Sequence, residues 1–475
     1  MKRFIALLLA LFLLPCWALA EMTFTFGAEN PTETLTFCGG TIPFDVRNKL
    51  LEDNPGLQIK FIDDYIGASD VVQALTNHDS TVDVYEIPAD YVYARILDKK
   101  LAADLSVSEV LTADAQTMDS RILGLLTDDE GHLRAYPASM SMQRWTISEG
   151  LWRLIWGDEP LPTTIEALLT AWLDWETNYA DDYPQMEFLE GFTYTEWCRR
   201  LIEFYAMQYE QPGEYLDLNA PALKTALELL GKINDVRRRN NRATTGADYA
   251  EGWAETAPII SLGMGEQIME SYWSFDSGID PYLYDVDWTR LSVLPLTFAE
   301  GDPLKYHASM DVYVINPYSE HQEMALKFIE CATYLESSPY VAYAIHPQLT
   351  EPIENPNHER WVTIFREELE RIESALAAAE PADVPELQDE LTRATFQLEQ
   401  LEKGRWLIST EDMEAYRAIS DQLDFHTRSF FVGSRNEAAA VIRELCERYC
   451  AGSMSMDVFL DELAGRLSMM IQENQ

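Results

Sequence analysis

The stretch Pro258–Trp273 holds the residues whose types and spacing best suit ligand recognition. An apolar run, Ile259–Gly263, is followed by a helix-compatible segment, Glu266–Met269, and the stretch ends on Tyr272 and Trp273. We predict a strand or turn that feeds a short helix and delivers Trp273 to a loop edge. A large flat aromatic ring there suits stacking on a ligand ring. The alternative, which a lone tryptophan favours, is that Trp273 packs in the core.

A block of alternating strands and helices near the start of the chain is expected to help position such a group. Strands are expected at 35–38, 57–62 and 82–86, and helices at 44–53, 68–76 and 91–99, so the pattern predicts a parallel sheet with covering helices. Residues 21–34 show little pattern. Ligands of open sheets lie beyond the carboxyl ends of the strands. We therefore place at the rim of the site the residues that follow two of these strands: Gly39, Gly40, Thr41, Asp90 and Tyr91. Turn chemistry for the glycines and an N-cap role for Asp90 are the alternatives.

The middle of the chain is expected to line the same site. Residues 127–137 read as a hairpin with its turn at Glu130–Gly131. The acidic residues of this turn lack EF-hand spacing, so no metal site is predicted. Ser139, Ser141 and Gln143 then alternate on one side of an extended segment, with Trp145 close behind.

Composition and the first residues narrow the class of protein. Residues 1–20 have a basic start, a short apolar core and a small-x-small ending, which predicts a secretory signal peptide and an exported, soluble chain. Cys16 raises lipid anchoring as an alternative, although Pro15 precedes it. The formal net charge of −45 argues against a nucleic-acid partner. We find no Gly-x-Ser-x-Gly, His-Glu-x-x-His or phosphate-binding loop, so no catalytic residue and no cofactor are predicted.

The order of these motifs resembles the extracellular solute-binding proteins of ABC transporters, in the sugar-binding, maltose-binding-like branch. Gly265, Met269 and Trp273 match the binding-site segment, and the opening lobe is matched by Asn54-Pro55-Gly56, Asp83-Val84 and Leu101–Leu105. The chain departs from the branch at His307–Asp311, where glycines are usual, and at Ile147-Ser148-Glu149, which replaces Tyr-Asn-Lys.

The resemblance implies an α/β, two-lobed periplasmic-binding-protein-like fold of class II. Residues 30–138 with 296–335 would form one lobe, and 139–295 with 336–475 the other. The implied function is capture of a small solute, a mono- or oligosaccharide, by hinge closure of the two lobes. The solute would then be delivered to an ABC transporter permease. The resemblance also implies a monomer located in the periplasm or on the outer face of the cell membrane. The implied ligand contacts add Tyr272, Trp273 and His307 to Trp145 and the serines. A secreted carbohydrate-active enzyme and a sensor that presents its ligand to a kinase are the alternatives.

Three further features lie outside the resemblance. Residues 357–404 carry two amphipathic stripes separated by Pro381 and Pro385, which predict a helical hairpin inserted in the second lobe. This hairpin could serve as a lid or a partner contact, or its helices could simply pack on the surface of the lobe. Cys446 and Cys450 have i, i+4 spacing, which suits neither a relaxed disulfide nor a zinc site, so we interpret them as small apolar side chains. The run 237–239 of three arginines is interpreted as a solvated helix end.

Overall fold

The computed structural model describes residues 22–40, 42–63, 68–189, 193–211, 216–240, 242, 256–265, 271–272, 282–284, 286–287, 290–333, 343–355, 357–381, 384–403, 405–425, 429 and 437–474. It divides into two compact units. Unit 1 is Met1–Ser139 with Asp311–Ser338, and unit 2 is Met140–Met310 with Pro339–Gln475. The division falls inside two strands, β5 (Tyr136–Ile147) and β12 (Tyr306–Ile315). Residues 296–310 thus belong to unit 2 in this division.

Unit 1 contains the parallel sheet that the sequence predicts. Its strands run in the order β1-β3-β2-β4-β12, where β1 is Met22–Gly27, β2 Glu33–Gly39, β3 Leu57–Asp63 and β4 Val84–Pro88. Strands β2, β3 and β4 are mutually parallel, and β1 and β12 flank them in the antiparallel sense. Residues 21–34 show little pattern in the sequence, yet Thr23 to Phe26 alternate polar and aromatic side chains and pair along β3 as an edge strand.

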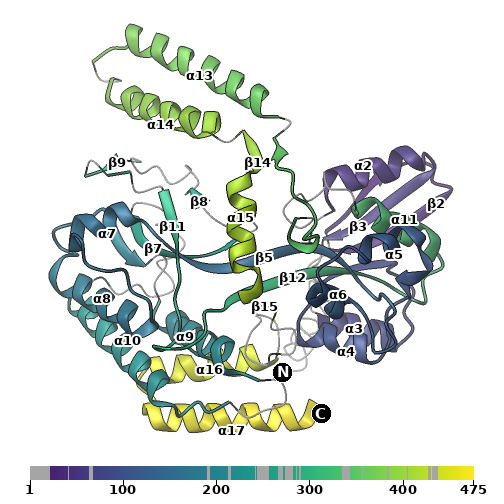
Figure 1. Cartoon of the computed structure of the whole chain (residues 1–475), viewed down its shortest axis with the longest axis horizontal. Helices are drawn as coiled ribbons and strands as arrows, with labels where there is room; N and C mark the ends of the chain where they lie inside the picture. The colour runs from purple at the N-terminus through teal and green to yellow at the C-terminus, as the bar shows by residue number, and fades with distance from the viewer. Residues whose placement is uncertain are drawn as a thin grey trace, which may run out of the picture. The chain divides into compact units, whose positions relative to one another are not determined.

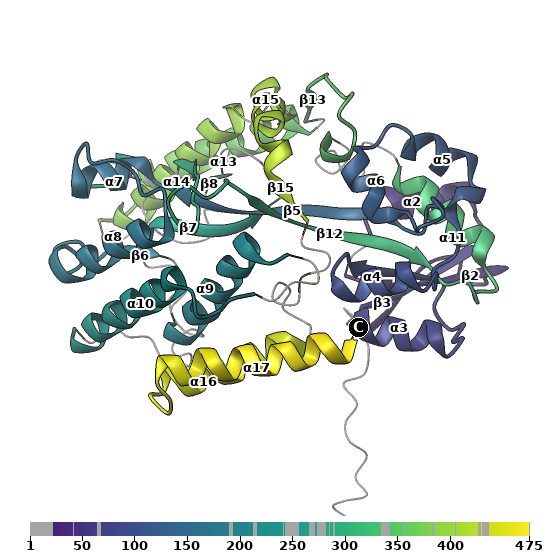
Figure 2. The same cartoon turned by 60° about the horizontal axis from the view of Figure 1, so that its bottom comes forward.

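Helices cover both faces of this sheet. Helix α2 (Phe44–Asp53) and α11 (Gln322–Ala332) lie on one face, and α3 (Ala68–Thr76) and α4 (Tyr91–Asp98) on the other (Figures 1 and 2). At the centre of the core, the ring of Phe37 lies 5.3 Å from that of Phe328 and 6.0 Å from that of Tyr313. All three are almost fully buried, and such aromatic side chains contribute much of the apolar burial that stabilises a domain. The short helices α5 (Glu109–Ala115) and α6 (Ser120–Leu126) complete the unit.

Asp83 is a buried structural group of unit 1. Its carboxylate accepts hydrogen bonds from the backbone N–H of Thr36 and the hydroxyl of Ser319. A buried carboxylate is tolerated only when donors satisfy it, and these two donors tie β2 to the segment that follows β12. The Asp83-Val84 motif therefore marks a connection inside the sheet.

Unit 2 is built on the second half of β5. That strand pairs with β7 (Ala257–Gly265) and β11 (Arg290–Leu294); β7 also pairs with β6 (Met186–Leu189), and β11 with β8 (Ser271–Tyr272). The remaining short strands are β9 (Tyr282–Leu283), β10 (Val286–Asp287) and β15 (Leu423–Asp424). Its helices are α7 (Glu149–Trp156), α8 (Ile165–Asn178), α9 (Tyr194–Tyr209), α10 (Pro221–Arg239), α15 (Thr410–Ile419), α16 (Glu437–Cys450) and α17 (Met456–Asn474).

A cluster of aromatic rings fills the core beneath these helices. Trp172 stacks on Phe188 at 5.9 Å and meets the edge of Trp197 at 5.6 Å. The sequence interpretation of these tryptophans as packing residues is confirmed by their near-complete burial. The interpretation of the arginine run as solvated is wrong for Arg237, because this side chain is buried and donates to the carboxylate of Glu176, which is 1% exposed.

The predicted helical hairpin is confirmed. Helices α13 (His358–Ala378) and α14 (Val384–Lys403) pack side by side along their length (Figure 1). The two strands at its base, β13 (Ile353–Glu354) and β14 (Trp406–Ile408), pair with each other in the antiparallel sense. The hairpin therefore leaves and rejoins unit 2 at one place.

Candidate functional site

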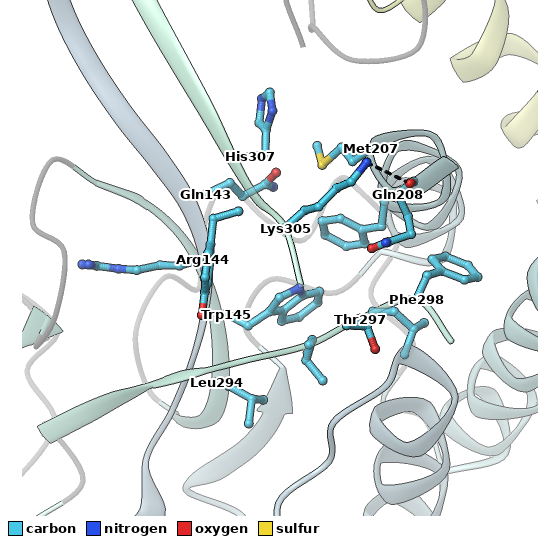
Figure 3. Close-up of a pocket in the computed structure, with 14 residues that line it drawn as sticks. Gln143, Arg144, Trp145, Met207, Gln208, Leu294, Thr297, Phe298, Lys305 and His307 are labelled. Atoms are coloured by element: carbon cyan, nitrogen blue, oxygen red, sulfur yellow. Dashed lines mark hydrogen bonds between the residues drawn. The ribbon is translucent and has the colours of Figure 1, made fainter. Parts of the chain in front are cut away.

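The candidate site in unit 2 is a pocket at the end of β5, shown in Figure 3. Its cavity volume is about 60 Å³. Four segments of the chain line it: the second half of β5, the first residue of α8, the second half of α9, and residues 294–307 around the start of β12. The residues that line it include Gln143, Trp145, Phe204, Met207, Lys305 and His307.

Trp145 forms the apolar wall of this pocket. Its ring lies 5.1 Å from that of Phe204 and 5.7 Å from that of Trp197, and the residue is 8% exposed. Met207, one turn along α9, adds a flexible thioether to the same wall (Figure 3). An indole held between aromatic neighbours is a rigid surface, which suits contact with the apolar face of a ring.

Polar groups reach the pocket from β5 and β12. Burial alternates along β5, with Ser139, Ser141 and Gln143 partly exposed and Met140 and Met142 buried, so the predicted alternation is confirmed. In unit 1, the Ser139 hydroxyl donates to Asp311 Oδ2 at 3.1 Å.

In unit 2, the hydroxyls of Ser141 and Ser309 share a hydrogen bond of 2.7 Å. The pairing of β5 with β12, continued by two residues along each strand, places Gln143 opposite His307. Both residues line the pocket.

Lys305 is the cation of the pocket, and its charge is already engaged. Its ammonium donates to the backbone carbonyl of Gln208 at 3.1 Å and lies 3.4 Å from Asp424 Oδ2 (Figure 3). A paired ammonium is a weak attractor for a further anion. The lining thus combines an aromatic wall with an amide, an imidazole and one paired ammonium, a composition that suits a polar ligand.

Arg144 lies next to Trp145 in the chain but points away from it (Figure 3). The residue is 5% exposed, its Nη1 has no hydrogen-bond partner among the described residues, and burial lowers the pKa of its guanidinium. Arg144 is among the residues that line the pocket, but because successive side chains of a strand alternate, its guanidinium points toward the opposite face of β5.

The predicted rim residues of unit 1 have clear structural roles. A Cβ on Gly39 would lie 2.5 Å from Cβ of Glu86, so the close approach of β2 to β4 requires glycine there. The N–H of Gly40 donates to Glu86 Oε2 at 3.0 Å, and Asp90 Oδ1 accepts from the N–H of Tyr93 at 3.3 Å as the N-cap of α4. The N-cap alternative for Asp90 is confirmed, whereas Gly39 is required by the close packing of two strands and not by a turn. Ligand contact of these residues stays a prediction.

The pocket brings together Trp145 and His307 of the predicted site residues. Tyr91 begins α4 and Tyr272 ends β8, where its backbone pairs with Arg290. Thr41 and Trp273 lie outside the described residues. Sequence reasoning missed Phe204, Met207 and Lys305, because α9 reads as an ordinary amphipathic helix and nothing local marks which of its residues meet β5.

One group of side chains in the described part has the geometry of a metal site. Carboxylate and imidazole atoms of Asp128, Glu130 and His132 lie within 4.8 Å of one another. The oxygens of Asp128, however, already accept from the N–H groups of Glu130 and His132 and from Arg134 Nε. The turn at Glu130–Gly131 is confirmed, with Gly131 at φ +84° and its N–H bonded to the carbonyl of Asp128. We interpret the group as the anchor of this turn.

The fold of this chain is similar to that of solved solute-binding proteins of ABC transporters. No family model matches the sequence, and no curated protein is similar to it. Comparison with solved structures confirms the α/β fold predicted from the sequence. Helices within the described residues are too short or too polar to cross a membrane.

Two of these structures show the extent of the likeness. The maltose-bound MalE3 of T. maritima is 14% identical, with a TM-score of 0.54 over 92% of this chain and all of that chain. The ABC substrate-binding protein Lmo0181 of Listeria monocytogenes, in complex with cycloalternan, is 13% identical, with a TM-score of 0.54 over 93% of this chain and 99% of that one. At these identities, the comparison establishes the shared fold.

Proposed function

We propose that this protein is an exported solute-binding protein that captures an uncharged, hydroxyl-rich solute, a carbohydrate or polyol, for an ABC importer. The observation that carries the proposal is the match of almost the whole chain to solute-binding proteins, among them structures with bound maltose, cycloalternan, tagatose, ribitol and mannitol. The pocket of unit 2 supports it, because Trp145 offers a rigid aromatic wall and Gln143 and His307 offer neutral hydrogen-bonding groups.

The charges of the chain support a neutral ligand over an anionic one. The formal net charge of −45 repels anions at a distance. Near the pocket, the ammonium of Lys305 is held by the Gln208 carbonyl and by Asp424. A hydroxyl-rich solute needs no counter-ion, and its hydroxyls can donate to and accept from an amide and an imidazole.

Calorimetry and thermal shift on the chain from Glu21 onward test the proposal. Maltose, D-mannitol, ribitol and D-tagatose are the neutral probes, and gluconate is the anionic counterpart of similar size. We expect at least one neutral probe to bind and to raise the melting temperature, because a ligand that binds only the folded form stabilises it. Binding of gluconate alone, or of no probe in a panel extended to oligosaccharides, would refute the ligand class.

A second measurement separates binding from catalysis. Each probe that binds is incubated with the protein overnight and then analysed by chromatography. Recovery of the intact probe supports a binding protein, whereas cleaved or isomerised products would favour the carbohydrate-active enzyme.

A further inference from the structure

Three cysteines of unit 2 meet where α9 packs on α16. Cys198 lies in the second turn of α9, and Cys446 and Cys450 lie one turn apart at the end of α16. The two helices are in contact. Cys446 and Cys450 are the neighbouring thiols that, together with burial, raise the pKa of Cys198. All three are free cysteines.

Neighbouring residues fix the way these two helix ends face each other. The ring of Tyr194, in the first turn of α9, lies 6.4 Å from that of Tyr449, in the last turn of α16. The last turn of α16 is therefore held against the first turn of α9. Of the three thiols, Cys450 is partly exposed, whereas Cys198 and Cys446 are fully buried.

The surroundings of Cys450 favour its thiolate. The hydrogen bond from Cys198 lowers the pKa of Cys450 against the opposing effect of burial, and Thr195 and Arg238 lower it further. By contrast, its two thiol neighbours and burial raise the pKa of Cys198. A partly exposed thiolate beside a buried thiol is the arrangement of an attacking cysteine and its resolving partner.

We propose that Cys450 and Cys198 form an oxidisable pair that closes into a disulfide between α16 and α9 when the protein meets a small-molecule disulfide such as oxidised glutathione. Cys450 is the last residue of α16, so its backbone can adjust to the Cα separation of about 4.4–6.8 Å that a disulfide needs. Cys446 lies within the helix and has less freedom to move. The inference is independent of the proposed function.

The reaction has two exchange steps. The Cys450 thiolate attacks one sulfur of oxidised glutathione, so that a mixed disulfide forms and the S–S bond of the oxidant breaks to release one glutathione thiolate. Cys198 then gives up its proton and attacks Sγ of Cys450, which expels the second glutathione. Two cysteines are oxidised by two electrons, and one oxidised glutathione is reduced to two molecules of the thiol.

Trypsin distinguishes the possible linkages, because it cleaves after Arg448, between Cys446 and Cys450. Cys198 falls in peptide 154–199, Cys446 in 444–448 and Cys450 in 449–466. The reduced, folded chain is incubated with oxidised glutathione, blocked with iodoacetamide in denaturant, digested and analysed by mass spectrometry. Before blocking, we expect an intact mass lower by two hydrogen atoms. After digestion, we expect a link between peptides 154–199 and 449–466 that dithiothreitol reverses. Cys38 and Cys331, buried in unit 1, should remain reduced.

Variants assign the two roles. Cys446→Ala should form the same link at the same rate, whereas Cys198→Ala should stop at a stable glutathione adduct on Cys450. Circular dichroism confirms that each variant is folded, and the wild-type peptide map decides the question if Cys198→Ala does not fold. A link to peptide 444–448, a stable glutathione adduct on the wild type, or no modification of the folded wild type would each overturn the proposal.

Discussion

Replacement of Asp128 by asparagine should destabilise unit 1 far more than replacement of the adjacent Asp129. The Asp128 side chain is 1% exposed, and its Oδ2 accepts from Arg134 Nε at 2.8 Å. Oδ1 accepts from the N–H groups of Glu130 and His132 at 3.0 and 2.9 Å. Asparagine keeps the shape and the carbonyl acceptor, but it removes the charge and turns an amide N–H toward the guanidinium.

The expected magnitude follows from burial. Arg134 is 13% exposed and would keep only its bond to the carbonyl of Ala102, and removal of one partner of a buried ion pair costs about 3–5 kcal/mol. Asp129 is 82% exposed and meets Lys100 at 3.0 Å, so Asp129→Asn should cost at most about 1 kcal/mol. Asp128→Asn and Asp129→Asn change the same functional group at adjacent positions, so the second substitution is the control for the first.

The pH dependence gives an independent check. Burial alone would raise the pKa of Asp128, but the N–H of His132, the guanidinium of Arg134 and the N–H of Glu130 outweigh burial and lower the pKa to about 2. The pKa of the folded state thus lies below that of the unfolded chain, about 3.9. The stabilisation is therefore fully present above about pH 4 and is lost as the pH falls toward 2. Asp128→Asn should reduce the slope of stability against pH in this window.

Urea unfolding followed by far-ultraviolet circular dichroism measures both variants. Tryptophan fluorescence does not suffice, because unit 1 contains no tryptophan beyond Trp17 of the leader. Hydrogen exchange on peptides covering 128–136 locates the effect. Equal costs for the two substitutions, or an unchanged acid slope in Asp128→Asn, would refute the assignment of this carboxylate as a buried anchor.

Three further predictions concern ligand binding. Gln143→Ala should weaken binding of a neutral probe about tenfold, or about 1.4 kcal/mol, with an unchanged melting temperature; an unaltered Kd in calorimetry would remove Gln143 from the site. Trp273→Ala should weaken binding by a few kcal/mol if the ring stacks on the ligand, whereas a stability loss of about 3–5 kcal/mol with binding intact would make Trp273 a core residue. Deletion of residues 357–404 with a short linker should leave affinity within about threefold, or about 0.7 kcal/mol; a large loss in a folded variant would make the hairpin part of the site.

Local pattern was enough to predict the helices and strands of unit 1. The helices at 44–53 and 68–76 have the predicted bounds, because their apolar faces are regular. Strand β1 was missed, since its four alternating residues follow directly on the predicted leader.

The site was predicted only where one strand carries it. The alternation of β5 identified Ser139, Ser141 and Trp145 correctly as one face of a strand. Phe204, Lys305 and the meeting of Cys198 with Cys450 depend on contacts between segments that lie far apart in the chain. The spacing of Cys446 and Cys450 excluded a bond between those two, but it carried no information about a third thiol on another helix.

The pairing of strands β13 and β14 at the base of the α13–α14 hairpin has a consequence for how this chain can be modified. Because Ile353 pairs with Ile408 and Glu354 with Trp406, the two points at which the hairpin is attached are held next to each other by the body of unit 2. Any segment whose own ends lie close together could occupy this position without stretching the surrounding fold. A folded domain with neighbouring termini, grafted between residues 355 and 405 in place of the hairpin, should therefore leave unit 2 folded.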